Sequence, residues 1–305
     1  MLTSNPHITL SDLPPPPPGR TGFPWTEASP LLAESILPHI PRITISTPSY
    51  NQGQFIEETI RSVLLQGYPN LEYIVIDGGS TDDSIDIIQK YADFLTYWVS
   101  EPDRGQSDAI NKGFTRSTGE LMGWLNSDDY LAPGALFKLA THYKSGLHWW
   151  NGNALNLEPD GSLRGYPQLK QQITRNHLLH ACTIITQVST FWTRELWDKV
   201  GAVVSDIHLA MDYDLWLRFS QHVPATVLHD TLAIYRTHAD AKTGSASGQM
   251  FYRLECDTLR RVEYDQLGLN ILTRSILINF WTRSLLAELY SDWRSWIGRR
   301  KIPYV

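Results

Sequence analysis

The feature that most constrains the fold of this chain is an alternation of short apolar runs with helix-type patterns between residues 42 and 129. The apolar, β-rich runs are 42–47, 71–77, 95–99 and the stretch that begins at Gly119. Helical spacing of apolar residues follows each of the first three runs. Strands and helices that alternate through short loops predict an α/β fold with a mainly parallel sheet, flanked by helices on both faces.

The fourth apolar run ends abruptly in the polar sequence Asn126-Ser127-Asp128-Asp129. Open α/β sheets bind ligands at the carboxyl ends of their strands, where these two carboxylates would lie. A Mg²⁺- or Mn²⁺-sized ion usually takes one or two protein carboxylates together with oxygens from substrate phosphates. The pair therefore fits a metal site for a phosphate-bearing substrate, or an acidic turn in which Asp129 caps a helix starting near Pro133.

Composition divides the chain into three regions. Residues 1–40 lack periodicity and contain the unbroken proline run 14–18, which favours polyproline II or disorder. Whether 23–25 docks on the rest of the protein stays open. Residues 41–240 carry the alternating pattern and form the main domain, and 241–305 are predicted to be a helical region.

The pattern loosens in the second half of the main domain. A hairpin is predicted around Asp160-Gly161, strands at 183–192 and 225–235, a helix at 211–222 and a polar loop at 236–248. No repeat period is evident in this half or elsewhere.

Charge and cysteine content exclude several classes of protein. The net charge is 26 − 32 = −6, without a long basic run outside the C-terminus, so a nucleic-acid binder is not expected. Cys182 and Cys256 lack a CxxC spacing and are expected to be reduced and buried in a cytoplasmic protein. No basic-then-apolar leader and no long uninterrupted apolar run occur, so neither a secretory signal nor a membrane span is expected.

Six motifs follow one another in the main domain. They are Thr47-Pro-Ser-Tyr-Asn-Gln52, Asp77-Gly-Gly-Ser-Thr-Asp82, Glu101-Pro-Asp-Arg-Gly-Gln-Ser-Asp-Ala-Ile-Asn111, Asn126-Ser-Asp-Asp129, Met211-Asp-Tyr-Asp-Leu-Trp-Leu-Arg218 and Tyr235-Arg-Thr-His238. In this order and spacing they resemble the family-2 inverting glycosyltransferases. The resemblance covers about 42–240 and implies the GT-A (nucleotide-diphospho-sugar transferase) fold with a C-terminal helical extension.

The resemblance places donor-binding residues just past the first two strands. Those that would hold the nucleobase are Thr47, Pro48, Tyr50 and Asn51. The ring of Tyr50 could instead be a packed aromatic side chain. Asp77 would accept a hydrogen bond from an N–H of uracil or thymine, or it would cap the turn that follows it.

The third motif implies further donor contacts from a segment that leads from a loop into a helix. Arg104 could pair with the diphosphate, and Asp108 lies at the same edge. A structural ion pair between Arg104 and an acidic neighbour is an equal alternative.

The resemblance assigns the metal to the fourth and sixth motifs. Asp128 would be a ligand of Mn²⁺ or Mg²⁺, and His238 would be a second ligand of the metal or diphosphate; a lone histidine in a polar loop could also be merely solvated. Asn126 stands where the family has an acidic residue, and it would contact ribose or sugar. Asp129 belongs to the same donor-binding element.

In the fifth motif Met211 replaces the glutamate of the family's Glu-Asp signature, so Asp212 would be the general base that deprotonates the acceptor. Asp214 is the weaker alternative, because two residues along a helix it faces elsewhere. Trp192 and Trp216 could stack on the acceptor sugar, and core packing would explain each equally well.

The predicted activity is hexosyl transfer, with inversion, from a UDP- or dTDP-sugar to a hydroxyl of a glycan or a lipid-linked acceptor. A sugar-1-phosphate nucleotidyltransferase is one alternative, although a Gly-rich basic loop is missing after the first strand, where 48–52 stands. A non-catalytic nucleotide-sugar- or carbohydrate-binding module is another, supported by Asn126 and Met211 and opposed by Asp128 and Asp212.

The C-terminal region suggests an additional contact. An apolar stripe at helical spacing is accompanied by basic residues that cluster at its end; the stripe is Ile278, Trp281, Leu285, Leu289 and Trp296, and the cluster is Arg294, Arg299, Arg300 and Lys301. This pattern fits peripheral docking on the inner face of an anionic membrane, where lipid-linked acceptors are found. Packing on the main domain, or on a second subunit in a homodimer, fits it equally.

Overall fold

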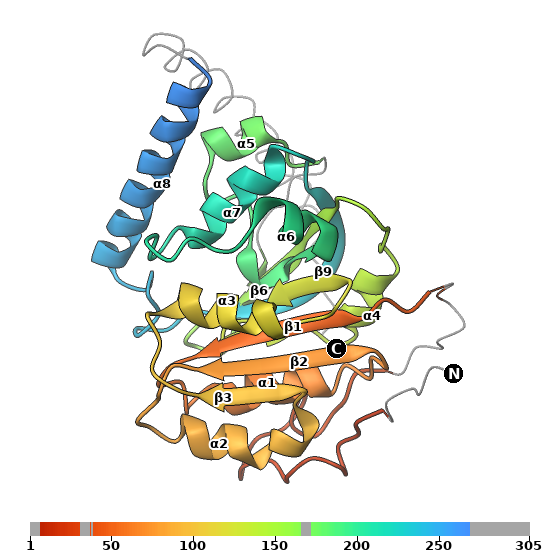
Figure 1. The fold of residues 1–305 in the computed structure, drawn as a ribbon. Helices are drawn as coiled ribbons and strands as arrows, with labels where there is room; N and C mark the ends of the chain where they lie inside the picture. Colours follow the sequence, from red (N-terminus) through yellow and green to blue (C-terminus); the bar gives the residue numbers. More distant parts are fainter. Residues whose placement is uncertain (1–6, 31–36, 38, 166–171, 269–305) are drawn as a thin grey trace, which may run out of the picture.

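The structure of the protein, a computed structural model, describes residues 7–30, 37, 39–165 and 172–268. Within these residues the chain forms a nine-stranded sheet with helices packed against it (Figure 1). The strands lie in the order β3-β2-β1-β4-β8-β6-β9-β5, and β7 pairs with β6.

The elements alternate most regularly in the first half of the chain. The strands are β1 Ile43–Ser49, β2 Leu71–Asp77, β3 Tyr97–Ser100, β4 Leu121–Trp124, β5 Tyr130–Leu131, β6 Trp149–Leu157, β7 Leu163–Gly165, β8 Thr190–Thr193 and β9 Thr226–Arg236. The α-helices are α1 Ile56–Leu64, α2 Ser84–Lys90, α3 Gln106–Arg116, α4 Ala135–Ala140, α5 Arg175–His180, α6 Arg194–Val200, α7 Met211–Ser220 and α8 Ala246–Gln266. The 3₁₀ helices η2 (Ala92–Phe94) and η3 (Gln187–Ser189) precede β3 and β8.

The first half of the sheet is parallel, as predicted. β1 pairs with β2 and β4, and β2 pairs with β3, all in the parallel sense. Tyr73 and Val75 of β2 join the core cluster that contains α1, whereas Ile74 and Ile76 join a cluster with α3. Burial on both faces explains why this strand is a continuous apolar run. The parallel order brings the carboxyl ends of β1, β2, β3 and β4 to one edge.

The second half of the sheet is mixed, so the mainly parallel sheet holds for the first half alone. β8 runs antiparallel to β4 and β6, β9 runs parallel to β6, and β5 runs antiparallel to β9. The strand predicted at 183–192 is wrong over most of its length, because Gln187–Ser189 form η3 and pairing starts at Thr190. The predicted hairpin is confirmed by the antiparallel pairing of β6 with β7.

The N-terminal arm docks on α1 through a buried arginine. The side chain of Arg61 is fully buried, and it donates to the carbonyl oxygens of Pro14 at 2.8 Å, Pro24 at 3.0 Å and Trp25 at 3.1 Å. Its guanidinium group also lies over the Trp25 ring, 5.4 Å from the centroid. These contacts settle the question that the sequence left open: 23–25 belong to the packed structure.

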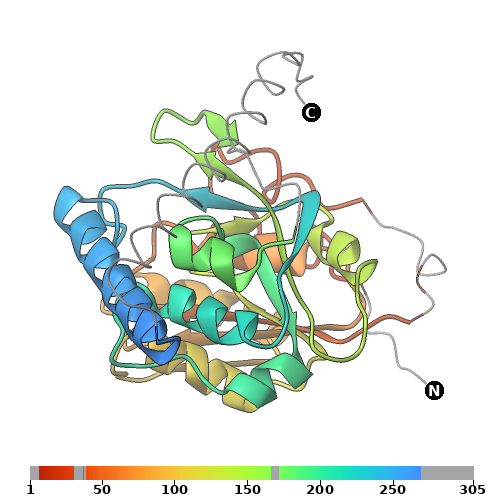
Figure 2. The ribbon, with the colours of Figure 1, turned by 90° about the horizontal axis from the view of Figure 1, so that it is seen from above.

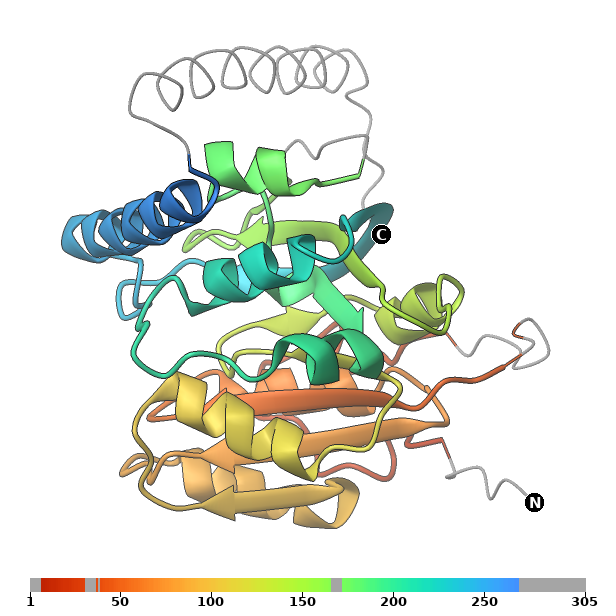
Figure 3. The same cartoon turned by 45° about the horizontal axis from the view of Figure 1, so that its top comes forward.

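The last described helix, α8, runs along the outside of the half of the molecule that carries α7 (Figures 2 and 3). It begins at Ala246, inside the stretch 236–248 that was predicted to be a polar loop. Among the residues that the structure describes, no helix has both the length and the apolar character needed to cross a bilayer. The apolar stripe and basic cluster of the predicted membrane contact lie outside the described residues.

Candidate active site

The polar loop 126–129 follows β4 and is held by the end of β9. Arg236 donates from its backbone N–H to Oδ1 of Asp129 and from Nε to the carbonyl oxygen of Asp128, both at 2.9 Å. Its Nη2 lies 3.1 Å from Oε2 of Glu58 on α1. These contacts use the backbone carbonyl of Asp128 and the carboxylate of Asp129. The carboxylate of Asp128 takes no part in them, so it can bind other partners.

The Asp128 carboxylate meets His238, which lies in the loop after β9. Asp128 Oδ2 is 3.0 Å from His238 Nε2. The imidazole packs on the ring of Phe55, with centroids 4.6 Å apart. Nδ1 of His238 is buried and has no hydrogen-bond partner among the described residues. The structure thus brings together the two side chains that the resemblance implied as metal ligands.

This donor set fits a divalent cation that shares its ligands with a substrate. Carboxylate and imidazole groups suit Mn²⁺, and Mg²⁺ favours oxygen ligands. Among the described residues, no group of three or more His, Cys, Asp or Glu side chains could hold a metal. A cation held by Asp128 and His238 would therefore need its remaining ligands from a bound diphosphate or water.

Asp129 supports the loop and has little surface to offer a donor. It is only 7% exposed. Burial and the neighbouring charge of Asp128 raise the pKa of the Asp129 carboxyl well above its ordinary value, against the hydrogen bond from Arg236. Its low exposure and its bond from Arg236 favour a structural role in the loop, and contact with a donor stays a prediction. Asp129 does not cap a helix, because α4 begins only at Ala135 and has no side-chain cap.

Asn126 joins a chain of polar side chains that sequence reasoning missed. Its Oδ1 accepts from Nε2 of Gln106 at 2.8 Å, and Gln106 Oε1 accepts from Nζ of Lys242 at 2.7 Å. Asn126 Nδ2 also donates to Oε1 of Gln187 at 3.2 Å. Gln106 is part of the third motif. Lys242 lies in the predicted polar loop 236–248 and Gln187 in the predicted strand 183–192, and no motif marks either residue. The Lys242 ammonium group also lies close enough to Asp128 for their charges to interact.

Of the residues expected around the nucleobase, Tyr50 is the most available. It is 60% exposed just past β1, so the alternative of a packed ring is wrong. Asn51 has a positive φ of 51°, and its Oδ1 accepts from the N–H of Thr81 at 2.8 Å, which ties the two turns together. Thr47 and Pro48 are buried within β1, so their side chains serve the core.

Asp77 holds the turn after β2. Its Oδ2 accepts from the N–H groups of Gly79 at 3.1 Å and Ser80 at 2.9 Å, and from Oγ of Ser100 at 2.7 Å. Its Oδ1 accepts from the Ser80 hydroxyl at 2.6 Å. Asp77 is fully buried, so the structure supports the turn-capping role and not direct contact with a base.

Arg104 and Asp108 form an ion pair at the start of α3. Arg104 Nη2 lies 2.9 Å from Asp108 Oδ1, and Lys112 Nζ lies 3.5 Å from Asp108 Oδ2. Asp108 and Lys112 line a cleft of about 530 Å³ beside α3. Arg104 therefore forms the ion pair with an acidic neighbour that was one of its two predicted roles. Its side chain is 79% exposed.

Asp212 and Asp214, both in the first turn of α7, differ in their surroundings. Asp212 Oδ1 accepts from the N–H of Tyr213 at 2.7 Å, and no other residue that the structure describes donates to this carboxylate. Burial raises the pKa of Asp212 to about 6, against the backbone hydrogen bonds that lower it. Asp214 is paired with Arg218 at 2.8 Å. Asp212 therefore has the free lone pairs and the raised basicity of a general base.

The first turn of α3 connects the loop 126–129 to the start of α7. Gln106 bonds to Asn126, and the next residue, Ser107, donates from Oγ to Sδ of Met211 at 2.9 Å. Met211 precedes Asp212 directly. Two adjacent residues of α3 thus contact the loop that carries Asp128 and the residue that precedes Asp212.

Trp192 and Trp216 are core residues, which corrects the expectation that they line the acceptor. They are 0% and 1% exposed, and their ring centroids lie 5.7 Å apart. Trp216 also stacks on Trp149 at 5.5 Å and on Trp124 at 5.9 Å. This cluster fills the space between β4, β8 and α7, so neither indole has a face left for a sugar.

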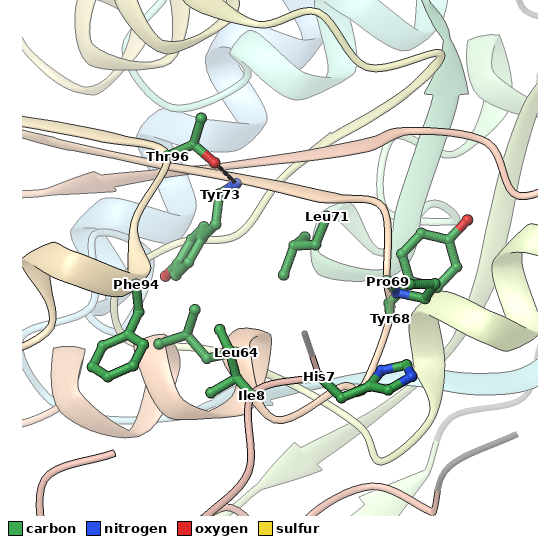
Figure 4. Close-up of a pocket in the computed structure, with 10 residues that line it drawn as sticks. His7, Ile8, Leu64, Tyr68, Pro69, Leu71, Tyr73, Phe94 and Thr96 are labelled. Atoms are coloured by element: carbon green, nitrogen blue, oxygen red, sulfur yellow. Dashed lines mark hydrogen bonds between the residues drawn. The ribbon is translucent and has the colours of Figure 1, made fainter. Parts of the chain in front are cut away.

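A small cavity under the N-terminal arm is not part of this site. It measures about 70 Å³ and includes Ile8, Leu71 and Thr96 among its walls (Figure 4). Leu71 and Thr96 lie at the amino ends of β2 and β3, at the edge of the sheet opposite Asp77 and Ser100. The cavity therefore lies away from the edge where the motifs gather.

Comparison with known proteins identifies the family. A model of glycosyl transferase family 2 matches residues 44–148. An uncharacterized glycosyltransferase of Mycobacterium tuberculosis is 30% identical over 183 residues, covering 58% of this chain and 68% of that protein. The chain belongs to glycosyltransferase family 2. It is a glycosyltransferase enzyme. The chain is also similar to an uncharacterized glycosyltransferase of Rickettsia typhi, with 26% identity over 69% of this chain and 68% of that protein.

Solved structures confirm the predicted GT-A fold. TarS 1–349 of S. aureus matches with a TM-score of 0.59 at 19% identity, covering 78% of this chain and 69% of that one. The mannosyltransferase PcManGT of Pyrobaculum calidifontis, in complex with GDP-Man and Mn²⁺, matches with a TM-score of 0.58 at 18% identity, covering 87% and 78%.

Proposed function

We propose that this glycosyltransferase moves a sugar from a nucleotide-diphosphate donor to an acceptor hydroxyl with inversion at the anomeric carbon. The observation that carries the proposal is the contact of Asp128 with His238. Asp212 supports it, because its carboxylate accepts from the N–H of Tyr213 and has a raised pKa. In an inverting transfer the acceptor oxygen attacks opposite the leaving diphosphate, so a base and a metal site are needed on opposite sides of the sugar.

Asp128 and His238 would hold the divalent cation, Mn²⁺ or Mg²⁺. Such an ion, when bound, supplies positive charge that stabilises the departing diphosphate. The solved structure of PcManGT, which contains Mn²⁺ with GDP-Man, supports a divalent cation. Lys242, hydrogen-bonded to Gln106 beside the loop, would add a second positive charge on the same side.

Asp212 would remove the acceptor proton. Its carboxylate is ionised above about pH 6, so at neutral pH it can accept a proton and return it to water between turnovers. Tyr50 would stack on the nucleobase from its exposed position past β1. A UDP- or dTDP-sugar is the proposed donor, and a TarS structure in complex with UDP-GlcNAc supports the uridine nucleotide.

The test is a donor screen with the full-length protein and Mn²⁺. UDP-GlcNAc, UDP-glucose, dTDP-glucose and GDP-mannose are incubated singly, and release of the nucleoside diphosphate and of sugar is followed, with NMR of the anomeric proton reporting inversion. We expect release of a nucleoside diphosphate that requires the metal. Pyrophosphate chemistry would indicate the nucleotidyltransferase alternative, and binding without turnover would indicate a binding module.

The acceptor is proposed to be a glycan or a lipid-linked sugar. The chondroitin synthase of Pasteurella multocida, 29% identical over 62% of this chain but only 20% of its own length, supports a glycan acceptor. The proposed place of action is the cytoplasm or the inner face of a membrane, with the C-terminal region contacting anionic lipid or a second subunit. Flotation with anionic liposomes at low salt tests the lipid contact, and protein that stays in the soluble fraction contradicts it.

A further inference from the structure

Glu255 of α8 binds the segment that leads into Asp212. Its carboxylate accepts hydrogen bonds from the backbone N–H groups of three consecutive residues: His208 at 3.1 Å, and Leu209 and Ala210 at 2.8 Å each. α7 begins at the next residue, and its N-cap residue supplies no side-chain cap. The start of the helix that carries Asp212 is therefore fixed by a side chain from a distant helix.

The charge of Glu255 suits this contact. Burial opposes its ionisation, but the three N–H donors, together with the nearby His208 side chain, lower the pKa of the Glu255 carboxyl below its ordinary value. An ionised acceptor forms stronger hydrogen bonds with N–H groups than a neutral one does. A negative charge beside the amino end of α7 is also favourable for the helix dipole.

The same face of α8 lies close to Asp212. Tyr252, one turn before Glu255, donates from its hydroxyl to the carbonyl oxygen of Cys182 at 3.3 Å. Burial raises the pKa of the Tyr252 hydroxyl, and the nearby charge of Asp212 raises it further. α8 thus lies beside Asp212 through Tyr252, and through Glu255 it binds the segment that leads into α7.

We propose that Glu255 is a positioning residue for Asp212. By holding the three amides that precede α7, it sets the direction in which the Asp212 carboxylate meets the acceptor hydroxyl. This inference rests on the proposed function, in which Asp212 is the base. A displacement of about 1 Å in a reacting group costs on the order of 10²-fold in rate, so a contact outside the site can control turnover.

The kinetic test uses the full-length protein, Mn²⁺ and UDP-GlcNAc, and it measures UDP release. Glu255→Gln keeps the side-chain shape but has a single acceptor oxygen, so at least one N–H loses its partner. We expect kcat to fall about 10- to 100-fold and the donor KM to stay within about twofold. The control is Asp257→Asn on the same helix, whose carboxylate pairs with Arg260, and it should match the wild type.

A double variant shows whether Glu255 acts through Asp212. In an Asp212→Asn background, Glu255→Gln should cause no further fall in kcat, because the base it positions is already lost. If kcat of the double variant fell by the product of the two single-variant losses, the inference would be overturned. Wild-type kcat in a folded Glu255→Gln protein would overturn it as well.

Amide hydrogen exchange provides a readout that does not need turnover. Glu255→Gln should exchange at least about tenfold faster than wild type over 208–213 and equally over α3, whereas Asp257→Asn should be unchanged. Equal exchange over 208–213 would overturn the inference. If wild-type protein released no nucleotide from any donor, the proposed function would fail instead, and exchange would still decide whether Glu255 orders this segment.

Discussion

Oδ2 of Asp128 lies 3.0 Å from Nε2 of His238, although 110 residues separate the two side chains in sequence. Arg236 accounts for this proximity, because it ends β9, binds the backbone of the loop at Asp128 and precedes His238 by two residues. The pairing of Arg236 with the half-buried Glu58 anchors both segments to α1. The metal side of the proposed site is thus assembled by β9 and not by its own loop alone.

The first prediction follows from this contact. Asp128→Asn should weaken Mn²⁺-dependent binding of UDP by about tenfold or more, because an amide is a poorer ligand for a hard cation than a carboxylate. The fold should tolerate the change, since the Asp128 side chain is 22% exposed and its loss of charge relieves repulsion with Asp129. Calorimetric titration with Mn²⁺ and UDP measures the effect.

Asp86→Asn is the control, because Asp86 is exposed on α2 and belongs to none of the motifs. If Asp128→Asn bound Mn²⁺ and UDP as tightly as this control, Asp128 would not be the ligand.

The elements that local patterns determine could be predicted from the sequence. α3 follows the third apolar run, where a helix was predicted, and β2 ends at Asp77 as predicted, because apolar period and turn residues agree there. β8 could not be predicted in this way. It pairs through Trp192 with Met122 of β4 and Trp149 of β6, so tertiary partners decide which residues of 183–193 extend.

The motifs predicted Asp128 and His238 as partners in one site, and the structure places Oδ2 of Asp128 3.0 Å from Nε2 of His238. The role of Asp212 stays a prediction. For Asp77 the sequence left two roles open, because a carboxylate before two glycines and a serine can cap a turn or bind a nucleobase. In the structure, N–H groups of the turn donate to this carboxylate, which favours the capping role. The orientation of Trp216 depended on the packing of three other indoles, which no spacing along the chain encodes.

The second prediction concerns the nucleobase. Tyr50→Ala should lower UDP affinity by about 5- to 100-fold, since stacking of a base on an aromatic ring contributes roughly 1–3 kcal/mol. Because Tyr50 is 60% exposed, the melting temperature should hardly change. Tyr50→Phe keeps the ring and should bind like wild type. Equal UDP affinity of the alanine and phenylalanine variants, measured by calorimetry, would remove Tyr50 from the donor site.

The third prediction tests whether the N-terminal arm belongs to the folded domain. Arg61→Lys cannot reach the carbonyl oxygens of Pro14, Pro24 and Trp25 together, so buried acceptors lose their donors. The expected loss of stability is about 2 kcal/mol or more, with cleavage of the arm by limited proteolysis. Arg20→Lys is the control, because Arg20 is exposed and only lies over the Trp25 ring. Equal unfolding curves for the two variants would mean that the arm contributes little.

The fourth prediction concerns pH. A base must be ionised to act, so kcat/KM for UDP release should fall about tenfold per pH unit below pH 6 and level off above it. The pKa of folded Asp212 lies above the ordinary 3.8, so its ionised form destabilises the fold, and that cost grows as pH rises from about 4 to 6. Asp212→Asn should therefore melt at a higher temperature than wild type at pH 7.5. An acid limb near pH 4, or a lower melting temperature for the variant, would contradict the raised pKa.

The fifth prediction separates chemistry from binding within one helix. Asp212→Asn keeps the shape of the side chain but removes its basicity, so turnover should fall on the order of 10²–10⁴-fold while UDP and Mn²⁺ bind normally. Asp214→Asn should leave turnover within about threefold, because its carboxylate pairs with Arg218. Arg218 would keep its hydrogen bonds to the carbonyl oxygens of Val200 and Ala202, so stability should fall by about 1 kcal/mol or less. Steady-state rates and donor affinities of both variants and the wild type make the comparison. Normal turnover in Asp212→Asn would exclude Asp212 as the base, and a collapse confined to Asp214→Asn would move the base two residues along α7.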